Sequence, residues 1–162
     1  MPHDQITFIK STWSQLDILQ TFTVCLYAED PNSDSKTTSR PPSIKLTMAE
    51  FERKPDKGSL ISILEGTDLI GYAIIIFFWS NEYGGDVIEI DELYISPASR
   101  NRGVGSSFFT WLEIEYKDSA RGLSLQVSPQ NCQAVELYER LGFSLSPNKH
   151  LLKLRDACAN QT

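Results

Sequence analysis

Residues 69–79 constrain the fold more than any other part of this sequence. They are almost all apolar, and Gly71 to Trp79 (GYAIIIFFW) shows no alternation with polar residues. A strand of this kind has both faces buried, so other elements must cover its sheet on each side. The run is far shorter than the roughly 20 apolar residues of a membrane-spanning helix, and no basic-then-apolar leader opens the sequence. We therefore expect a soluble, cytoplasmic protein without a membrane partner.

Further strands are predicted around this run. Residues 59–65 precede it across a turn at Gly66, and residues 87–95 (VIEIDELYI) follow it after a turn at 81–86. These three strands form a β-meander. Other short strands are expected at the start of 5–27, at 123–127 and at 151–154.

Helical spacing of apolar residues marks four segments. Amphipathic helices are predicted for the rest of 5–27, for 103–117 and for 131–141, and Gly142 is expected to cap the last of them. A shorter helix through Phe51 is expected to open at Thr47, whose capping-box partner is Glu50, and to end at Pro55. Strands and helices together predict an α+β fold, and the length fits a single domain over residues 1–162.

Two segments are predicted to lack regular structure. Residues 29–42 are too rich in Pro, Ser, Thr and Asp for a helix or strand, so we expect a flexible surface loop, either a passive connector or a substrate-side lid. The tail at 156–162 is expected to fray.

Charge and cysteine content narrow the classes of partner. The formal net charge of −6 disfavours a nucleic-acid partner and mildly favours cationic small molecules. Cys25, Cys132 and Cys158 lack the spacing of a zinc site or a disulfide framework, so we expect no metal. Cys132 is interpreted as a small apolar residue at a helix start rather than a nucleophile. His3 and His150 lie outside every motif.

The stretch SRNRGVGSS, residues 99–107, lies between a predicted strand and a predicted helix. Unpaired backbone amides and the helix dipole make such a turn suited to an anion, usually a phosphate. Gly103 and Gly105 lack the Cβ atoms that would hold a ligand off the main chain, and Arg100 and Arg102 can add charge at the rim. A tight turn with solvated arginines is the alternative interpretation.

Two common phosphate loops are excluded. A Walker A loop requires lysine after its second glycine, but Ser106 follows Gly105. A dinucleotide-binding fingerprint requires a third glycine where this chain has Phe108.

Three motifs in the same order and spacing resemble the GNAT acetyltransferases over about residues 71–143. The first is similar to the family's Leu-x-Val strand, the second to its Arg/Gln-x-x-Gly-x-Gly/Ala loop, and the third to its Asn-x-x-Ala-x-x-Leu-Tyr-x-x-x-Gly-Phe signature. Asn101 departs from the family, which often has glycine there. The matching residues are Leu93, Tyr94 and Ile95, then Arg100, Gly103 and Gly105, then Asn131, Ala134, Leu137, Tyr138, Gly142 and Phe143.

The resemblance implies a fold and an acyl donor. The expected fold is a twisted, mixed but mostly antiparallel sheet of six to seven strands with about four helices. The sheet is expected to splay between residues 93–95 and the strand at 123–127, where the pantetheine arm of acetyl-CoA runs beside the main chain. The implied acetyl-CoA contacts are Leu93, Tyr94, Ile95, Arg100, Asn101, Arg102, Gly103, Val104, Gly105, Ser106, Asn131, Ala134 and Tyr138. Asn131 is also an N-cap candidate.

The resemblance also implies catalytic roles. A main-chain amide near Leu93 or Tyr94 would stabilise the oxyanion, and Tyr138 would act as general acid, although it can equally be a packing residue. In polyamine-acetylating members the acidic pair before this strand end lies at the amine, which corresponds to Asp91 and Glu92. Strand alternation puts Glu89 and Asp91 on one face and Glu92 on the other unless a bulge intervenes. A solvated charged face is the alternative.

The acceptor is predicted less closely than the donor. Trp79, Glu82 and Tyr83 lie in the turn before the acidic strand, where aromatic faces and a carboxylate suit a cation, although hairpin packing also explains them. We expect an N-acetyltransferase acting on a small primary amine such as a polyamine, an aminoglycoside or an amino-acid derivative. The alternatives are a non-catalytic acyl-CoA-binding module and a protein or charged-tRNA acetyltransferase. Relatives in the family also make a homodimer plausible.

Overall fold

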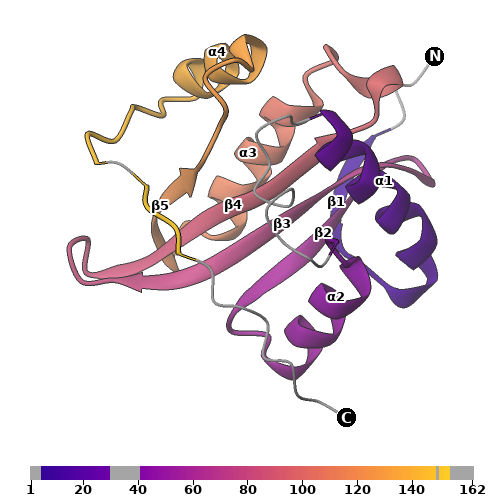
Figure 1. Ribbon diagram of the computed structural model, residues 1–162, viewed down its shortest axis with the longest axis horizontal. Coiled ribbons are helices and arrows are strands. Elements are labelled where there is room, and N and C mark those ends of the chain that lie inside the picture. The colour runs from indigo at the N-terminus through magenta and orange to yellow at the C-terminus, as the bar shows by residue number, and fades with distance from the viewer. Residues whose placement is uncertain (1–4, 30–40, 149, 154–162) are drawn as a thin grey trace.

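The computed structural model describes residues 5–29, 41–148 and 150–153, which contain a five-stranded sheet in the order β1-β2-β3-β4-β5 (Figure 1). Neighbours from β1 to β4 are antiparallel, and β4 and β5 are parallel. The sheet is therefore mixed and mostly antiparallel, as expected. Its strands are β1 (Ile6–Lys10), β2 (Gly58–Glu65), β3 (Asp68–Ser80), β4 (Gly85–Ile95) and β5 (Ala120–Leu125).

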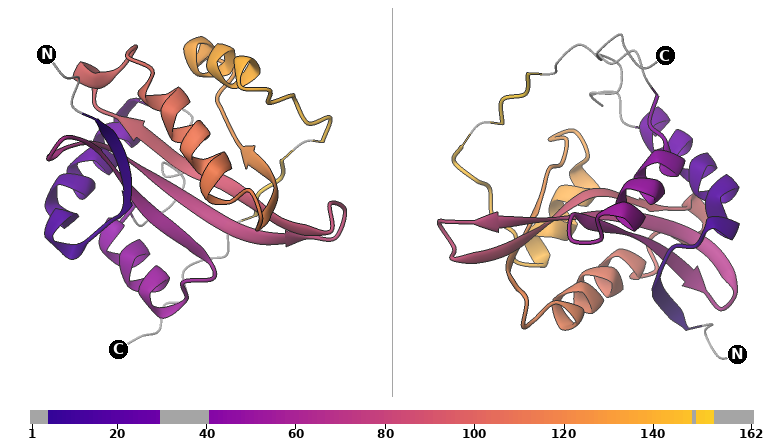
Figure 2. Two further views of the ribbon diagram at one scale, coloured as in Figure 1. Left: turned by 180° about the vertical axis from the view of Figure 1, so that it is seen from behind. Right: turned by 90° about the horizontal axis from the view of Figure 1, so that it is seen from below.

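Helices cover both faces of this sheet. Figure 2 shows α1 and α2 on one face and α3 on the other, with α4 beside β5. The helix α3 is the crossover that makes β4 and β5 parallel neighbours. The α-helices are α1 (Leu16–Glu29), α2 (Ile44–Arg53), α3 (Val104–Glu115) and α4 (Cys132–Arg140), and short 3-10 turns are formed by Trp13–Gln15 and Pro97–Ser99.

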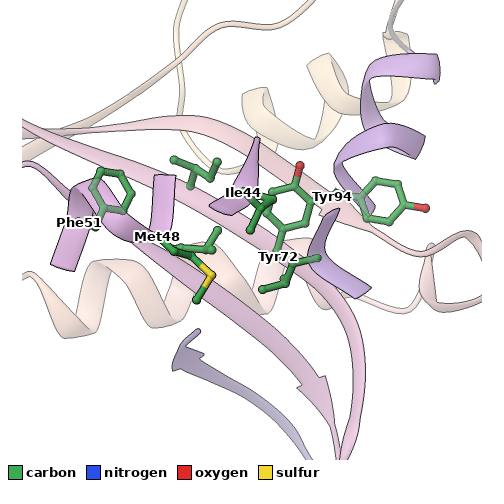
Figure 3. Packing of buried hydrophobic residues seen from close by; sticks show 8 residues of the cluster. Ile44, Met48, Phe51, Tyr72 and Tyr94 are labelled. Atoms are coloured by element: carbon green, nitrogen blue, oxygen red, sulfur yellow. The ribbon is translucent and has the colours of Figure 1, made fainter. Parts of the chain in front are cut away.

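The apolar run in β3 is buried on both faces from Ile70 to Ile75, which confirms the prediction from composition for this part of the run. At its end, Phe78 and Trp79 are 42% and 68% exposed, where the β3–β4 hairpin extends beyond the other strands (Figure 1). Tyr72 and Ile74 belong to a cluster with α1 and α2, part of which Figure 3 shows. Ala73 and Ile75 belong to a second cluster with α3. Successive residues of a strand point to opposite faces, so one uniformly apolar strand joins the two halves of the core.

The predicted start of α2 needs correction. The helix α2 begins at Ile44 and its N-cap is Ser43, whose side chain accepts a hydrogen bond from the Leu46 amide at 3.3 Å. Thr47 lies inside the helix and donates to the Ser43 carbonyl at 3.2 Å. The capping signal was therefore read one helical turn too late, because Ser43 lacks a Glu or Gln at the third helical position.

The expected last strand is also wrong where it can be seen. Residues 151–153 form no strand. Leu151 is 89% exposed, so its contacts with the described residues bury too little of the side chain to stabilise a strand there. The described residues consequently form five strands instead of six or seven. The expected loop falls mainly on residues 30–40 and the expected frayed tail on 156–162, which lie outside the described residues, and Glu29 belongs to α1.

Two helix-end predictions are confirmed. Gly142 follows α4 with φ of +91°, the left-handed conformation that glycine adopts most easily after a helix. Asn131 caps the start of α4, because its side-chain oxygen accepts from the Ala134 amide at 3.3 Å.

Candidate functional site

A β-bulge in β4 brings two carboxylates to one cavity. Ile74 of β3 lies opposite Glu92. The next residue, Ile75, lies opposite Ile90, so Asp91 has no partner in β3. Strict alternation would separate Asp91 from Glu92, and the extra residue cancels that alternation. Both side chains line the same cavity as a result.

This cavity has a volume of about 410 Å³ and lies between α1, α2 and the middle of β3 and β4. Three carboxylates border it, from Glu50, Asp91 and Glu92. Its other walls are largely apolar, and they include Ile44, Leu46, Phe51, Ile74 and Ile76. An acidic end and apolar walls suit a cation carried on an aliphatic chain.

Glu92 is the more enclosed member of the acidic pair. Tyr27 donates to its Oε1 at 2.5 Å, and Tyr72 donates to its Oε2 at 2.6 Å. Burial raises the pKa of Glu92, the two hydroxyl bonds oppose that rise, and the charge of Asp91 adds to it. The result is a pKa above the ordinary glutamate value.

Asp91 differs because its side chain reaches solvent. Within the described part of the chain its carboxylate accepts no hydrogen bond. Surrounding protein nevertheless displaces part of its hydrating water, which raises the pKa of Asp91, and the nearby Glu89 raises it further. Asp91 is thus a carboxylate at the cavity wall that has no hydrogen-bonding partner among the described residues.

Glu50, on the α2 side of the cavity, is already neutralised. Its carboxylate forms ion pairs with Lys57 and Arg53, each at 2.5 Å. The hydrogen bonds from Lys57 and then Arg53 lower the pKa of Glu50 to about 2. Glu50 therefore offers less attraction to an incoming cation than the acidic pair on β4.

The sheet splays at the same bulge. The pairing of β4 with β5 ends at Ile90 opposite Leu125, so within the described residues 91–95 have no strand on that side. On the other side, the Ser96 amide donates to the Ile70 carbonyl at 2.8 Å. Hydrogen-bonded and non-bonded pairs alternate in an antiparallel ladder, so the Leu93 amide points away from β3. The expected splay is confirmed, and Leu93 rather than Tyr94 presents its main chain to the open edge.

The turn before α3 exposes consecutive main-chain amides. From Asn101 to Ser106, no amide donates a hydrogen bond to any residue that the structure describes. Asn101 has φ of +58° and Gly103 has φ of +79°, which bends the main chain into a concave path. A Cβ added at Gly103 would meet no atom within 4 Å, so the space in front of the turn is open.

Both arginines of this turn are exposed, and each is paired with a carboxylate. Arg100 donates to both oxygens of Glu29 at 3.0 and 2.9 Å, and its Nε donates to the Ile95 carbonyl at 2.8 Å. Arg102 forms a bidentate ion pair with Glu65. The positive character of the turn therefore comes mainly from its amides and the start of α3.

Gly105 has a different function from Gly103. A Cβ at Gly105 would lie 3.3 Å from Leu137 Cδ2, so this glycine allows α3 and α4 to approach closely. The adjacent Val104 is buried, and Ser106 is partly exposed at the turn.

Tyr138 lies on the face of α4 that packs on α3. Its ring meets Phe109 and Phe143 edge-on, with centroid distances of 5.6 and 5.8 Å. Burial raises the pKa of Tyr138, and its hydroxyl has no hydrogen-bond partner in the described residues. Leu93 packs against the same apolar cluster, so the expected acid and the open edge of β4 are close in the fold.

The hairpin residues lie away from the cavity. Trp79 and Tyr83 are 68% and 63% exposed at the β3–β4 turn, Glu82 is also exposed, and none of them lines the cavity. This hairpin extends beyond the other strands in Figure 1.

Sequence reasoning missed Thr23, Tyr27 and Tyr72. Tyr72 did carry a signal, because a tyrosine inside a doubly buried apolar strand needs a partner for its hydroxyl. Thr23 and Tyr27 carried none, since their positions on α1 resemble any partly polar helix face.

No helix in the described parts of the chain is long and apolar enough to cross a membrane. The same residues contain no group of three or more His, Cys, Asp or Glu side chains arranged to hold a metal ion.

Residues 19–143 match the model of the acetyltransferase (GNAT) family. An uncharacterized N-acetyltransferase of Methanocaldococcus jannaschii is 36% identical over 77 residues, which cover 46% of this chain and 34% of that protein. A thialysine N-epsilon-acetyltransferase of Sus scrofa is 29% identical over 79 residues, covering 48% of this chain and 46% of that protein. The matches thus span less than half the length of these relatives.

The solved structure of AAC(6')-Iy in complex with the bisubstrate analog CoA-S-monomethyl-acetylneamine has a similar fold. Its TM-score to this chain is 0.66 at 16% sequence identity, and the superposition covers 95% of this chain and 99% of that one. At this identity the likeness concerns the fold alone.

Proposed function

Because the chain belongs to the acetyltransferase (GNAT) family, we propose that it transfers an acetyl group from acetyl-CoA to the primary amine of a small molecule. One observation carries the proposal. The acidic pair Asp91 and Glu92 lies in a cavity at the bulge where β4 separates from β5, close in the chain to a turn of open amides.

The donor would be held mainly by main chain. The amides from Asn101 to Ser106 suit a diphosphate, because they donate to none of the residues that the structure describes and a Cβ at Gly103 would meet no atom within 4 Å. The outward main-chain groups of Leu93 and Ile95 suit the amide-containing arm of acetyl-CoA, although the Ile95 carbonyl is shared with Arg100. Further contacts with acetyl-CoA are proposed for Tyr94, Arg100, Arg102, Val104, Gly105, Asn131, Ala134 and Tyr138.

The acidic pair would prepare the amine. Asp91 or Glu92 accepts the proton of the incoming ammonium, and the neutral nitrogen then forms its bond to the acetyl carbon. The Leu93 amide donates to the oxygen that gains negative charge. After the attack the nitrogen carries one surplus proton, which it releases to solvent or to the acidic pair. When the carbon–sulfur bond breaks, the Tyr138 hydroxyl gives its proton to the sulfur and is reprotonated from solvent. The raised pKa of Tyr138 keeps it protonated until that step.

The acceptor is proposed to be a small amine on an aliphatic chain. The apolar walls of the cavity and its acidic end support this, and so does the name of the Sus scrofa relative, a thialysine N-epsilon-acetyltransferase. Trp79, Glu82 and Tyr83 would contact only an acceptor long enough to reach beyond the cavity.

A second candidate is a non-catalytic acyl-CoA-binding module. The packing of Tyr138 between Phe109 and Phe143 favours it, because a purely structural tyrosine would pack in the same way. The two candidates differ in turnover and agree on donor binding.

The test is release of free thiol from acetyl-CoA with a panel of spermidine, lysine, thialysine, kanamycin and a short peptide. We expect at least one small amine to be acetylated, and Tyr138→Phe to lower kcat by about 10²-fold or more. Calorimetry should give the same affinity for coenzyme A in the wild-type protein and in the Tyr138→Phe variant. Binding without turnover of any acceptor would favour the module, and turnover of the peptide alone would favour a protein acetyltransferase.

A further inference from the structure

The Glu92 carboxylate is held at both oxygens. Tyr27 donates to one oxygen from α1 and Tyr72 donates to the other from β3, at 2.5 and 2.6 Å. We infer that Tyr27 and Tyr72 are positioning residues that hold Glu92 in one orientation at the cavity wall and leave Asp91 free to meet the ammonium group. This inference rests on the proposed function, since it assigns roles within the same site.

The hydroxyl of Tyr72 has only one way to use its proton. Thr23 Oγ1 donates to the Tyr72 oxygen at 3.0 Å, so the single proton of Tyr72 goes to Glu92. Thr23 and Tyr72 are both buried, and water therefore does not compete for these bonds. Burial and the charge of Glu92 raise the pKa of Tyr72 well above the ordinary tyrosine value, so it stays a donor throughout the working pH range.

The position of Tyr72 is fixed by the core. Tyr72 lies opposite Tyr94 in the β3–β4 ladder, and the centroids of the two rings are 6.2 Å apart. Figure 3 shows the Tyr72 ring beside Ile44 of α2 and near Tyr94. A fully buried ring in a paired strand has little freedom to turn, so its hydroxyl sets the place of the Glu92 oxygen.

Tyr27 donates the second hydrogen bond to Glu92 from α1, where it is less buried than Tyr72. It is half-buried on the last turns of α1 and lines the cavity together with Glu92. Its bond therefore ties α1 to the bulge of β4 at the side where an acceptor would enter.

The charged and titratable groups around Glu92 determine the sign of a pH effect. They are Tyr27 on α1, Tyr72 on β3, Asp91 on β4 and, across the cavity, Glu50 on α2, which Lys57 and Arg53 neutralise. Burial and Asp91 raise the pKa of Glu92, and the tyrosine bonds lower it. Loss of either hydroxyl must then raise this pKa further, so more Glu92 is protonated and inactive on the acidic side.

The first test is the pH profile of kcat/KM for Tyr27→Phe and Tyr72→Phe, measured with the best acceptor of the panel above. Ionisation of the acceptor amine affects the wild-type protein and its variants equally, so it cancels when their pH profiles are compared. We expect about tenfold lower kcat/KM at the acidic end for each variant, as loss of one hydrogen bond to a charged group predicts, and recovery toward wild type at high pH. Tyr116→Phe is the matched control, since this half-buried tyrosine contacts Phe77 and Trp111 away from the cavity.

The second test places both substitutions in a Glu92→Gln background. If the tyrosines act through Glu92, neither substitution lowers kcat/KM further there. Equal losses with and without Glu92 would show a purely structural effect and overturn the inference. Thermal unfolding identifies a variant that fails to fold, and Tyr27→Phe decides if Tyr72→Phe is such a variant.

The outcomes of these tests distinguish failure of the positioning role from failure of the proposed function. An active wild-type enzyme with unchanged pH profiles in both tyrosine variants overturns the positioning role alone. A wild-type protein that acetylates no amine of the panel overturns the proposed function and the inference together.

Discussion

The proposed acceptor side and the proposed donor side of β4 are built from different atoms. Around the cavity between α1, α2, β3 and β4, side chains from α1, β3 and β4 converge on two carboxylates. In the turn before α3 the exposed groups are main-chain amides, and the two arginines beside them are paired with Glu29 and Glu65.

Under the proposed function, this difference explains how each half would recognise its ligand. A diphosphate has many equivalent oxygens, so a curved run of amides suits it without a specific side chain. An amine must lose a proton at one place, so the acceptor side requires carboxylates whose pKa and orientation are set by neighbours. Substitutions of side chains should therefore affect the acceptor side most, and changes of backbone conformation should affect the donor side most.

The largest effect is expected from neutralising the acidic pair. Asp91→Asn combined with Glu92→Gln removes both proton acceptors, so kcat/KM for the best amine should fall by at least about 10²-fold. The affinity for coenzyme A, measured by calorimetry, should be unchanged. Glu113→Gln combined with Glu115→Gln removes the same charge from the exposed face of α3 and should leave turnover unchanged. Full activity without the acidic pair would mean that the amine loses its proton elsewhere.

An intermediate effect is expected from distorting the turn. A Cβ at position 103 would meet no atom within 4 Å, yet φ of +79° strains a β-branched residue such as valine, so the turn must rearrange. A cost of about 1–2 kcal/mol corresponds to roughly tenfold weaker binding of coenzyme A by Gly103→Val. Gly122→Val is the matched control, because Gly122 also has open space and its φ is not positive. An unchanged dissociation constant for Gly103→Val would show that the turn does not hold the donor.

The smallest effect is expected from removing a paired arginine. Arg102 is exposed and bound to Glu65, and such surface pairs contribute at most about 1 kcal/mol, so Arg102→Gln should weaken coenzyme A binding by less than about fivefold. Arg121→Gln, on the exposed side of β5, controls for the loss of one positive charge. A larger loss for Arg102→Gln than for Gly103→Val would reverse the comparison between main chain and side chain.

Much of the fold could be predicted because its signals are local. The apolar run in β3, the turns on either side of it, and the caps at Asn131 and Gly142 depend on residues within a few positions of each other. The start of α2 was predicted wrongly, and so was the strand at 151–154, which does not form at residues 151–153. A cap can be signalled by more than one nearby residue, and a strand forms only where a neighbour pairs with it.

The candidate site could be predicted only in part. The order of strand, glycine turn and helix located the open amides, and the acidic residues before Leu93 were visible as candidates. Their arrangement was not visible, because the bulge at Asp91 arises from a mismatch between the β3 and β4 ladders. The pairing of Arg100 with Glu29 spans 71 positions, beyond the reach of any local pattern.

The amino-acid sequence alone determined most of the helices and strands, their order, and the turn whose amides face outward, because these follow from periodicity, glycine positions and neighbouring residues. Tertiary structure alone decided that Asp91 and Glu92 share a cavity and that two tyrosines, 65 and 20 positions away from Glu92, donate to it. The reason is physical: a hydrogen bond between distant segments forms only after packing of the core has brought them together and excluded water.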